Sequence, residues 1–531
     1  MNITNFQQIF HRRAYQRAKL LYLPPDRLNM KKKGIRRKAV TAKKETLPDT
    51  IFSEVSPISP QGESLFNADR TITVQTVDRF ISEPTLVHAA MKQLREMGFG
   101  VLSTNYITIN ISGPPILYEK VFKTKLKMVE RPTVKHLGEE STTTVIDTTD
   151  TDIEGLIDTS KSAIADLLEG GAINRKVYFL SSSSSSYLPP SKSSYWNLDP
   201  PEVAVAMKAD HAHRAGITGR GIRVAMVDSG WYRHPYFSER GYRANPTILS
   251  PGATNPDHDE SGHGTGESAN IFAIAPDVEF TMVKMSPVNP AADFNAAVSL
   301  RPDIISCSWG MDLVMSDRRT QLPPPLPAYL RPLEAAIANA VRQGIVVVFS
   351  GGNGHFGFPG MHPDVISAGG VYMHQDGRKL EATQYASCFT SRIYQGRDVP
   401  DVCGLVGLPP KAIYLMLPVE PNDEIDKELS VGGSFPNGDE TTRNDGWAAF
   451  SGTSAAAPQL AGICALIKQA CPSISPSQLR EVLKRTARDV TLGKCSMRTG
   501  GHTAKLGHDL ATGAGLADAS EAVREARDLC S

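Results

Sequence analysis

The chain has 531 residues, of which 40% are hydrophobic and 21% are charged. These values are typical of a globular protein with two or three domains, since one domain usually has about 100–200 residues. The formal net charge of +1 argues against a general nucleic-acid or membrane binder. No run approaches the roughly eighteen apolar residues that a membrane-spanning helix requires.

Residues 1–67 are expected to form a basic, partly disordered leader. Its first 45 residues carry many lysines and arginines but only two acidic side chains, Asp26 and Glu45. A secretory signal has an apolar core after its charges, and this segment has none. Residues 6–22 fit a short basic amphipathic helix, so attachment to nucleic acid or an anionic surface is the alternative to a solvated tail.

Residues 68–131 are predicted to form a small α+β domain. Alternating and helical hydrophobic patterns predict, in order, a strand at 71–76, a helix at 83–97, strands at 99–102 and 106–111, a helix at 114–122 and a strand at 124–129. The order βαββαβ is that of the ferredoxin-like split βαβ arrangement. The alternative is an unrelated small α/β domain that binds another partner.

Residues 132–198 have the Ser, Thr, Asp and Pro content of a mobile linker. Residues 181–186 are all serine, and Pro189 and Pro190 follow them. Within this segment, 153–168 fits a helix and 176–180 fits a short extended apolar segment.

From residue 199 to 531, strands and helices alternate, which predicts an α/β fold with a mostly parallel sheet and helices on both faces. The expected elements are helices at 203–215 and 333–342, and strands at 222–227, 278–285, 304–309, 345–349 and 365–371. Long inserts at 311–329 and 404–447 interrupt the pattern, and we expect them to restrict access to a site.

Four short motifs in this region carry reactive side chains. Asp228 ends an apolar strand in Val-Asp-Ser-Gly, at the sheet edge where sites form in parallel α/β folds. His263 lies in Gly-His-Gly-Thr before an apolar run, and Asn353 follows a strand in Ser-Gly-Gly-Asn. Ser454 opens a predicted helix in Gly-Thr-Ser-Ala-Ala-Ala-Pro, where first-turn N–H groups are unpaired. Taken singly, each motif also fits a helix cap or a loop.

Together, in the order Asp, His, Asn, Ser, the four motifs resemble the signature blocks of the subtilisin-like serine peptidases. The resemblance covers about residues 199–531 and implies a subtilisin-like fold and a serine endopeptidase. It assigns Ser454 as the nucleophile, His263 as the general base and Asp228 as the carboxylate that orients it. It also implies that the Asn353 amide and the Ser454 N–H hold the oxyanion.

The resemblance further implies how a polypeptide substrate binds. One expected strand pairs with the substrate backbone, and a second segment forms the far wall of the pocket for an apolar residue before the scissile bond. The matching residues are Ser308, Trp309 and Gly310 for the strand, and Ser350, Gly351 and Gly352 for the wall. We expect a monomer with no cofactor, no nucleic-acid partner, and no metal site. Asp257, Asp259 and Glu260 fit a solvated turn.

The domain at 68–131 resembles the activation domains of the related sedolisin peptidases, in the strings Gly98-Phe-Gly-Val, Ile111-Ser-Gly-Pro-Pro and Val121-Phe-Lys-Thr-Lys-Leu. Before a subtilisin-like domain, this implies a pro-domain that inhibits its own enzyme within a zymogen. The pro-segment end lies in the cleft in such enzymes, which predicts that Val177–Leu180 acts as a pseudo-substrate with self-cleavage nearby. The catalytic motifs do not follow sedolisins, which use Glu and Asp where this chain has His263 and Asn353.

The seven cysteines are an odd number without CxxC spacing. Cys307 and Cys464 are expected to be buried thiols, and Cys495 could pair with Cys530. This pattern favours a reducing compartment and therefore a cytoplasmic location, which the sequence otherwise leaves open. Two other function classes also stay open: a latent regulatory protein that acts by binding, and a chain that its basic leader recruits to nucleic acid or an anionic surface.

Overall fold

The computed structural model describes residues 47–66, 71–136, 139–179, 199–313, 326–409, 414–430 and 438–531. Residues Thr46–Ser531 form one compact unit. The predictions for residues 1–45, for the serine run 181–186 and for Pro189 and Pro190 lie outside the described residues. Within the described ranges, no helix combines the length and hydropathy that crossing a bilayer demands.

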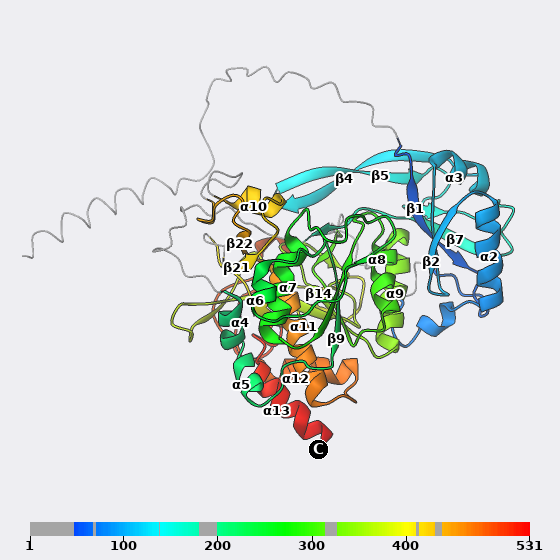
Figure 1. The fold of residues 1–531 in the computed structure, drawn as a ribbon. Coiled ribbons are helices and arrows are strands. Elements are labelled where there is room, and N and C mark those ends of the chain that lie inside the picture. Colours follow the sequence, from blue (N-terminus) through cyan, green and yellow to red (C-terminus); the bar gives the residue numbers. More distant parts are fainter. Residues whose placement is uncertain are drawn as a thin grey trace, which may run out of the picture. The chain divides into compact units, whose positions relative to one another are not determined.

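An eight-stranded sheet forms the centre of the region after residue 199 (Figure 1). Its strands, in spatial order, are β10 (Ile248–Leu249), β11 (Glu279–Lys284), β9 (Arg223–Asp228), β12 (Ile304–Cys307), β14 (Val346–Ser350), β16 (Ile366–Met373) and β17 (Leu380–Ala382), and β20 (Val402–Leu405) pairs with β16. Every pairing is parallel except that of β16 with β17. The predicted mostly parallel sheet is confirmed.

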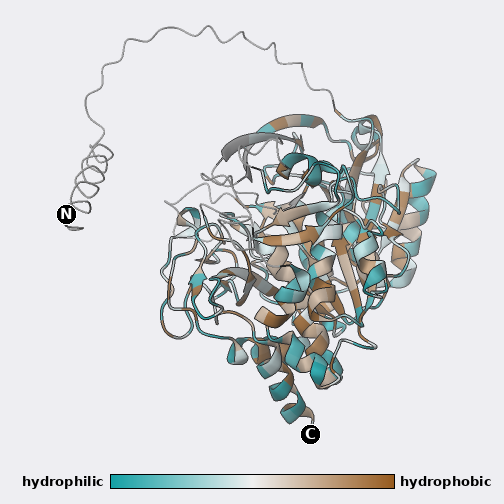
Figure 2. Ribbon diagram, turned by 60° about the vertical axis from the view of Figure 1, so that its left-hand side comes forward, coloured by the Kyte–Doolittle hydropathy of each residue, from teal (hydrophilic) through white to brown (hydrophobic). Residues whose placement is uncertain are grey.

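Helices cover both faces of this sheet. Val224 and Met226 of β9 pack into one hydrophobic core with α7 (His263–Ile274) and α11 (Thr453–Ala470). Ala225 and Val227, which point to the opposite face, pack with α8 (Pro290–Ser299) and α9 (Arg331–Arg342). Because both faces are buried, the central strands are apolar throughout, and Figure 2 shows the hydrophobic residues concentrated there.

Further helices lie around the first core. They are α4 (Pro200–Ala206), α5 (Ala209–Arg214), α6 (Pro235–Glu239), α12 (Pro476–Thr486) and α13 (Ala519–Cys530). The predicted helix at 203–215 is therefore interrupted. Lys208 between α4 and α5 has a left-handed φ of 60°. Its ammonium group pairs with the carboxylate of Asp518, the N-cap of α13, at 2.5 Å.

The N-terminal part forms a separate antiparallel sheet. Its elements are β1 (Ile51–Pro57), α2 (Pro84–Glu96), β2 (Gly100–Thr104), β3 (Ile109–Gly113), α3 (Pro115–Phe122), β6 (Leu156–Ile157) and β7 (Leu168–Ile173), with strand order β2-β3-β1-β7-β6. Without the short β6, these elements follow the predicted βαββαβ order.

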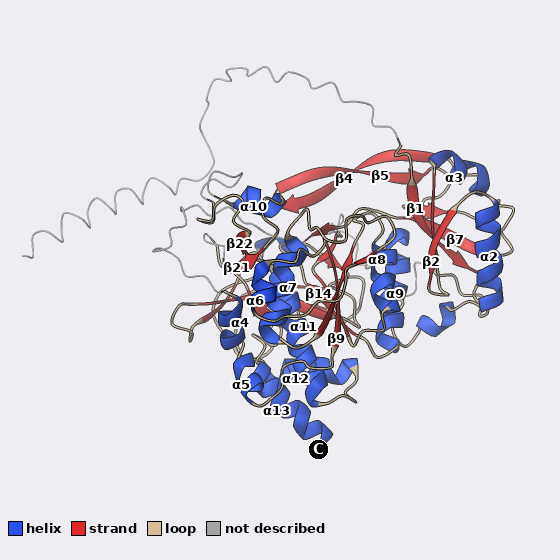
Figure 3. Cartoon of the chain, in the orientation of Figure 1, coloured by secondary structure: helices blue, strands red, loops and turns tan. Residues whose placement is uncertain are grey.

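One predicted strand of this domain is wrong, and another forms but lies outside the domain's sheet. Residues 71–76 form no strand, and the first strand is β1, within the expected leader. Residues 124–129 begin β4 (Leu126–His136), which pairs with β5 (Glu139–Thr148) as a separate hairpin (Figure 3). The last sheet strand is β7, within the expected linker, where the predicted helix at 153–168 is absent. The domain therefore extends beyond 68–131 at both ends.

The insert at 404–447 contains ordered elements of its own. It includes β21 (Leu415–Pro418) and α10 (Glu424–Leu429), and β21 pairs with β22 (Trp447–Phe450). Before the insert, another short pair joins β18 (Phe389–Thr390) to β19 (Asp398–Val399). The start of α10 donates from Glu424 N to the carbonyl of Glu260, so the insert packs on the loop that leads to His263.

Candidate active site

Asp228 and His263 meet at the carboxyl edge of the sheet. Asp228 is the last residue of β9, and His263 is the first residue of α7. His263 Nδ1 lies 2.7 Å from Asp228 Oδ1, and both side chains are buried. An imidazole that donates from Nδ1 presents Nε2 as its acceptor, so this carboxylate selects the tautomer that a general base needs.

Buried acidic groups dominate the electrostatics of His263. Burial alone lowers the pKa of His263, but the carboxylates of Asp228, Glu267 and Asp259 outweigh it and raise the pKa to about 9. Asp259 is fully buried, contrary to the solvated turn expected for it. Its carboxylate accepts hydrogen bonds from the N–H and the hydroxyl of Thr265, both at 2.7 Å, and thereby holds the first turn of α7.

Ser454 lies in the first turn of α11, beside α7. The proline at position 458 has no N–H, so it cannot donate to the Ser454 carbonyl as a helical residue would. The hydroxyl of Ser308 donates to that carbonyl instead, at 2.9 Å. In return the Ser454 hydroxyl donates to the Ser308 carbonyl at 3.2 Å. Ser308, which the sequence predicts to bind substrate, therefore also fixes the backbone of Ser454, the predicted nucleophile.

Asn353 lies in the loop after β14, next to the start of α11. Its side-chain oxygen accepts hydrogen bonds from the Thr453 N–H at 2.9 Å and from the Thr453 hydroxyl at 3.1 Å. These two bonds occupy the acceptor end of the amide and fix its plane. The donor end is the NH₂ group, and Thr453 directly precedes Ser454 in the chain.

The strand predicted to bind substrate is β13 (Trp309–Asp312), which begins after Ser308. The Trp309 indole donates to the Val227 carbonyl at 2.8 Å, which ties β13 to β9. On one edge β13 pairs with β15 (Gly357–Phe358). On its other edge it pairs with β8 (Tyr178–Phe179), with Gly310 opposite Tyr178 and Trp309 opposite Phe179.

The predicted pocket wall, Ser350–Gly352, connects β14 to the Asn353 loop. The Gly351 N–H donates to the Ala368 carbonyl at 2.9 Å, and the Gly352 carbonyl accepts from Ser387 N at 2.8 Å. Gly352 has a φ of 112°, and a Cβ there would approach the Ser387 hydroxyl to 2.9 Å. Glycine is therefore required at this point of the wall.

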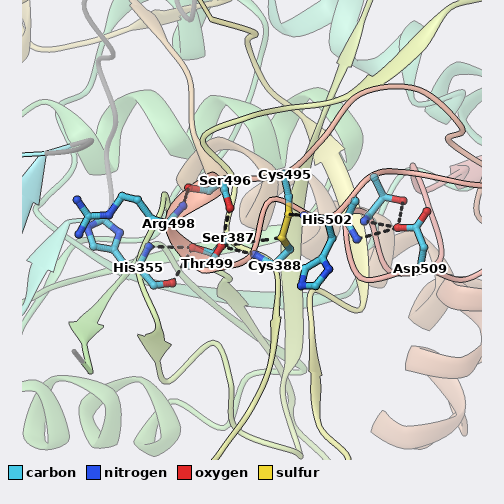
Figure 4. The surroundings of a disulfide bond; sticks show 11 residues. His355, Ser387, Cys388, Cys495, Ser496, Arg498, Thr499, His502 and Asp509 are labelled. Carbon is cyan, nitrogen blue, oxygen red and sulfur yellow. Dashed lines mark hydrogen bonds between the residues drawn. A yellow bond between two sulfur atoms is a disulfide. The ribbon is translucent and has the colours of Figure 1, made fainter. Parts of the chain in front are cut away.

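A disulfide holds Ser387 in place (Figure 4). Cys388 is bonded to Cys495, with their Cα atoms 6.0 Å apart. The Ser387 hydroxyl donates to the His355 carbonyl at 2.7 Å and accepts from His355 N at 2.9 Å. The Arg498 guanidinium, three residues after Cys495, donates to the Gly354 carbonyl at 3.2 Å. The disulfide thus supports the segment that carries Asn353. The spacing of the cysteines in the sequence does not indicate this pair.

The cysteine predictions need correction. A second disulfide joins Cys471 at the end of α11 to Cys530 at the end of α13, so the suggested pair of Cys495 with Cys530 is wrong. Cys307 and Cys464 are buried thiols, as expected. Disulfides are typical of oxidising compartments, so the expected reducing, cytoplasmic environment is not supported.

Among the side chains that the structure describes, no group of three or more His, Cys, Asp or Glu residues is arranged so that it could hold a metal ion. Of the predicted site residues, Asp228 and His263 form a direct pair, and Ser308, Asn353 and Ser454 are linked through Thr453 and the first turn of α11. The predicted substrate strand meets the N-terminal segment at β8.

Sequence comparisons match known proteins across the region that carries the four motifs. The chain matches the model of the subtilase family over residues 219–515, which include all four motifs. M-protease of Shouchella clausii (strain KSM-K16) is 26% identical over 293 residues, which cover 53% of this chain and 63% of that protein. Subtilisin Savinase of Lederbergia lenta is also 26% identical over 293 residues, covering 53% of this chain and 88% of that protein.

A solved structure supports the fold. The crystal structure of fervidolysin from Fervidobacterium pennivorans, a keratinolytic enzyme related to subtilisin, matches with a TM-score of 0.50 and 16% identity. The match covers 90% of this chain and 62% of fervidolysin. Since the family model extends over more than half of the sequence, this chain belongs to the subtilase family.

Proposed function

We propose that this chain is a serine endopeptidase, made as a zymogen, in which Ser454, His263 and Asp228 form the catalytic triad. The observation that carries the proposal is the bond between His263 Nδ1 and Asp228 Oδ1 at 2.7 Å, on the helix that packs beside Ser454. A buried serine at a helix start, a histidine in the base tautomer and a carboxylate that fixes it are the parts that acyl transfer needs.

In this mechanism Ser454 Oγ attacks the substrate carbonyl carbon while His263 Nε2 accepts its proton. Asp228 stabilises the imidazolium that forms, and the imidazolium then protonates the leaving amine. A water molecule then attacks the acyl-enzyme by the same steps, with His263 again as base and then as acid, and this releases Ser454. The Ser454 hydroxyl has to turn from the Ser308 carbonyl for this step, and such catalytic hydrogen bonds often tighten only when substrate is bound.

The oxyanion of the tetrahedral intermediate accepts from the Ser454 N–H and the Asn353 amide. Thr453 supports this role, because its two hydrogen bonds to the Asn353 side-chain oxygen keep the amide in one orientation. A donor held in advance stabilises developing charge without reorganising during the reaction.

We also propose that the N-terminal domain inhibits the enzyme, with Val177–Leu180 as the pseudo-substrate. The pairing of β8 with β13 supports this role, together with the bond from Val177 N to the Pro287 carbonyl at 2.7 Å. A polypeptide that binds by adding a strand needs a free edge of β13, and β15 already occupies the opposite edge. Substrate therefore requires the edge that β8 covers.

The test compares the intact mass of freshly purified wild type with that of Ser454→Ala. Cleavage between residues 131 and 200 in wild type alone, with Ser454 labelled by a fluorophosphonate probe, is the expected result. If Ser454 is labelled but the chain is not cleaved, the site works, and the N-terminal domain either inhibits it permanently or is removed only by an outside activator. Absence of both labelling and peptide hydrolysis, even after the N-terminal segment is cut by an added protease, would contradict the endopeptidase function.

A further inference from the structure

Glu267 places a second carboxylate beside His263. It lies one helical turn further along α7, where residues four apart share a face. Its Oε1 atom is 4.0 Å from Nε2 of His263, while Oε2 accepts a hydrogen bond from Asn270 Nδ2 at 2.9 Å. The Glu267 side chain is 0% exposed. His263 thus has a carboxylate near each ring nitrogen: Asp228 at Nδ1 and Glu267 at Nε2.

The surroundings of this pair contain little positive charge. Asp228 faces it from β9, and Asp259 faces it from the loop before α7. Helix α11, which packs on α7, has no acidic or basic residue before Lys468, and β21 has none at all. Helix α4 contributes only Glu202, whose carboxylate accepts from the backbone N–H of the N-cap Asp199. Among the described residues, only His263 forms an ion pair with Glu267.

The ionisation of the two groups is therefore linked. Burial raises the pKa of Glu267, His263 lowers it and Asp228 raises it again, to about 8 overall. The pKa of His263 is about 9, because the nearby carboxylates outweigh its burial. An opposite charge within about 4–6 Å favours the charged form of a group, typically by 1–3 pKa units. An ionised Glu267 thus favours the imidazolium over the neutral base.

We propose that Glu267 is a positioning residue that acts through His263: its carboxylate keeps the imidazole protonated up to alkaline pH and so sets the pH at which the general base becomes available. The inference rests on the proposed peptidase function, in which only the neutral imidazole accepts the proton of Ser454. Below that pH the enzyme is folded, but the imidazole of His263 is protonated and cannot act as a base.

The test is the pH profile of kcat/KM for wild type and Glu267→Gln on a chromogenic peptide. Gln keeps the shape and an acceptor for Asn270 but removes the charge. The acid limb of the profile should move to lower pH by about one unit, so activity well below the limb rises about tenfold relative to the plateau. The matched control is Glu260→Gln, which removes an exposed carboxylate paired with Lys284 on the preceding loop and should leave the limb in place.

A second variant separates charge from packing. Glu267→Met has a similar volume but no hydrogen bond to Asn270, and it should move the limb as far as Glu267→Gln does. A packing role would instead lower stability in the two variants by different amounts and leave the limb unmoved. A limb that stays at the wild-type pH in folded Glu267→Gln would overturn the inference.

A titration without turnover keeps this inference distinct from the peptidase proposal. In the Ser454→Ala background, NMR of isotope-labelled histidine reports the ionisation of His263 directly, with His263→Gln identifying its signal. Glu267→Gln should lower the pKa of His263 by about one unit in this background. An unchanged pKa would refute the role of Glu267 even if the wild type cleaves peptides. A lowered pKa in a chain without activity would refute the peptidase function alone.

Discussion

Replacing Glu54 by Gln tests how a buried acid makes the folded chain less stable as pH rises. Glu54 lies on β1 and is 1% exposed. It accepts a hydrogen bond from Asn110 at 2.6 Å, and Asn110 also donates to Asn289, the N-cap of α8, at 2.8 Å. Burial raises the pKa of Glu54 from 4.5 to about 7, although hydrogen bonds from Thr108 and Asn110 lower it.

The sign and size of the effect follow from these values. The folded chain binds the proton of Glu54 more tightly than the unfolded chain, so the free energy of unfolding falls as pH rises from 4.5 and reaches its full loss above about 7. One pKa unit corresponds to about 1.4 kcal/mol, which gives a loss of about 3 kcal/mol by pH 8. Gln keeps the shape and the acceptor for Asn110 but does not titrate.

The assay is urea unfolding of Ser454→Ala, with and without Glu54→Gln, at about pH 5 and pH 8. The drop in unfolding free energy between the two pH values should be smaller by about 2–3 kcal/mol in the Glu54→Gln chain. Glu96→Gln is the control, because that carboxylate is exposed on α2 and its replacement should leave the drop unchanged. An equal drop with and without Glu54→Gln would refute the reasoning.

Four further variants, two single and two double, test the site and its supports. Asn353→Ala should lower kcat about 100- to 1000-fold with KM nearly unchanged, a magnitude known from subtilisin; a large rise in KM at normal kcat would contradict the oxyanion role. Ser308→Ala leaves the Ser454 carbonyl without its donor and should lower the unfolding free energy by about 1–3 kcal/mol in thermal melts; an unchanged melt would show that another donor replaces it. Cys388→Ser with Cys495→Ser should cost about 2–4 kcal/mol and also lower kcat, whereas Cys471→Ser with Cys530→Ser, away from the Asn353 loop, should cost stability alone.

The sequence predicted the local structure around the candidate site residues, because short motifs mark the strand end and the helix starts there. Asp228 ends a strand and His263 starts a helix in the structure, as their motifs predict, because apolar strands and glycine turns are local signals. The Ser454 helix also begins within a residue of its predicted start. The meeting of Asp228 with His263 follows from the parallel α/β arrangement, in which strand ends and helix starts lie at one edge of the sheet.

The first strand of the N-terminal domain could not be found from its pattern. β1 pairs with β3 and with β7, and its polar side chains are buried along with its apolar ones. Ser53, Glu54 and Ser56 are each at most 1% exposed, and they interrupt the alternation that normally marks a strand. Its partner β7 contains Gly170 and Gly171, where a Cβ would meet Phe66 or Val55 within 3.0 Å. In the sequence, a glycine that a sheet needs for close packing cannot be told apart from a glycine in a linker.

Two buried acidic groups, Glu54 in the N-terminal domain and Glu267 beside His263, both lose their protons as the pH rises. Rising pH ionises Glu54 at the contact of β1 with Asn110 and Asn289, and this weakens the folded arrangement of the N-terminal domain. Over a higher range it removes the proton from His263, whose pKa is about 9. If the N-terminal domain inhibits the enzyme as proposed, its hold would weaken before the general base is fully available. In the proposed zymogen, alkaline conditions would then favour both steps through separate carboxylates, Glu54 for the first and Glu267 for the second. Glu54→Gln should then shift only release of the domain, and Glu267→Gln only the acid limb of catalysis.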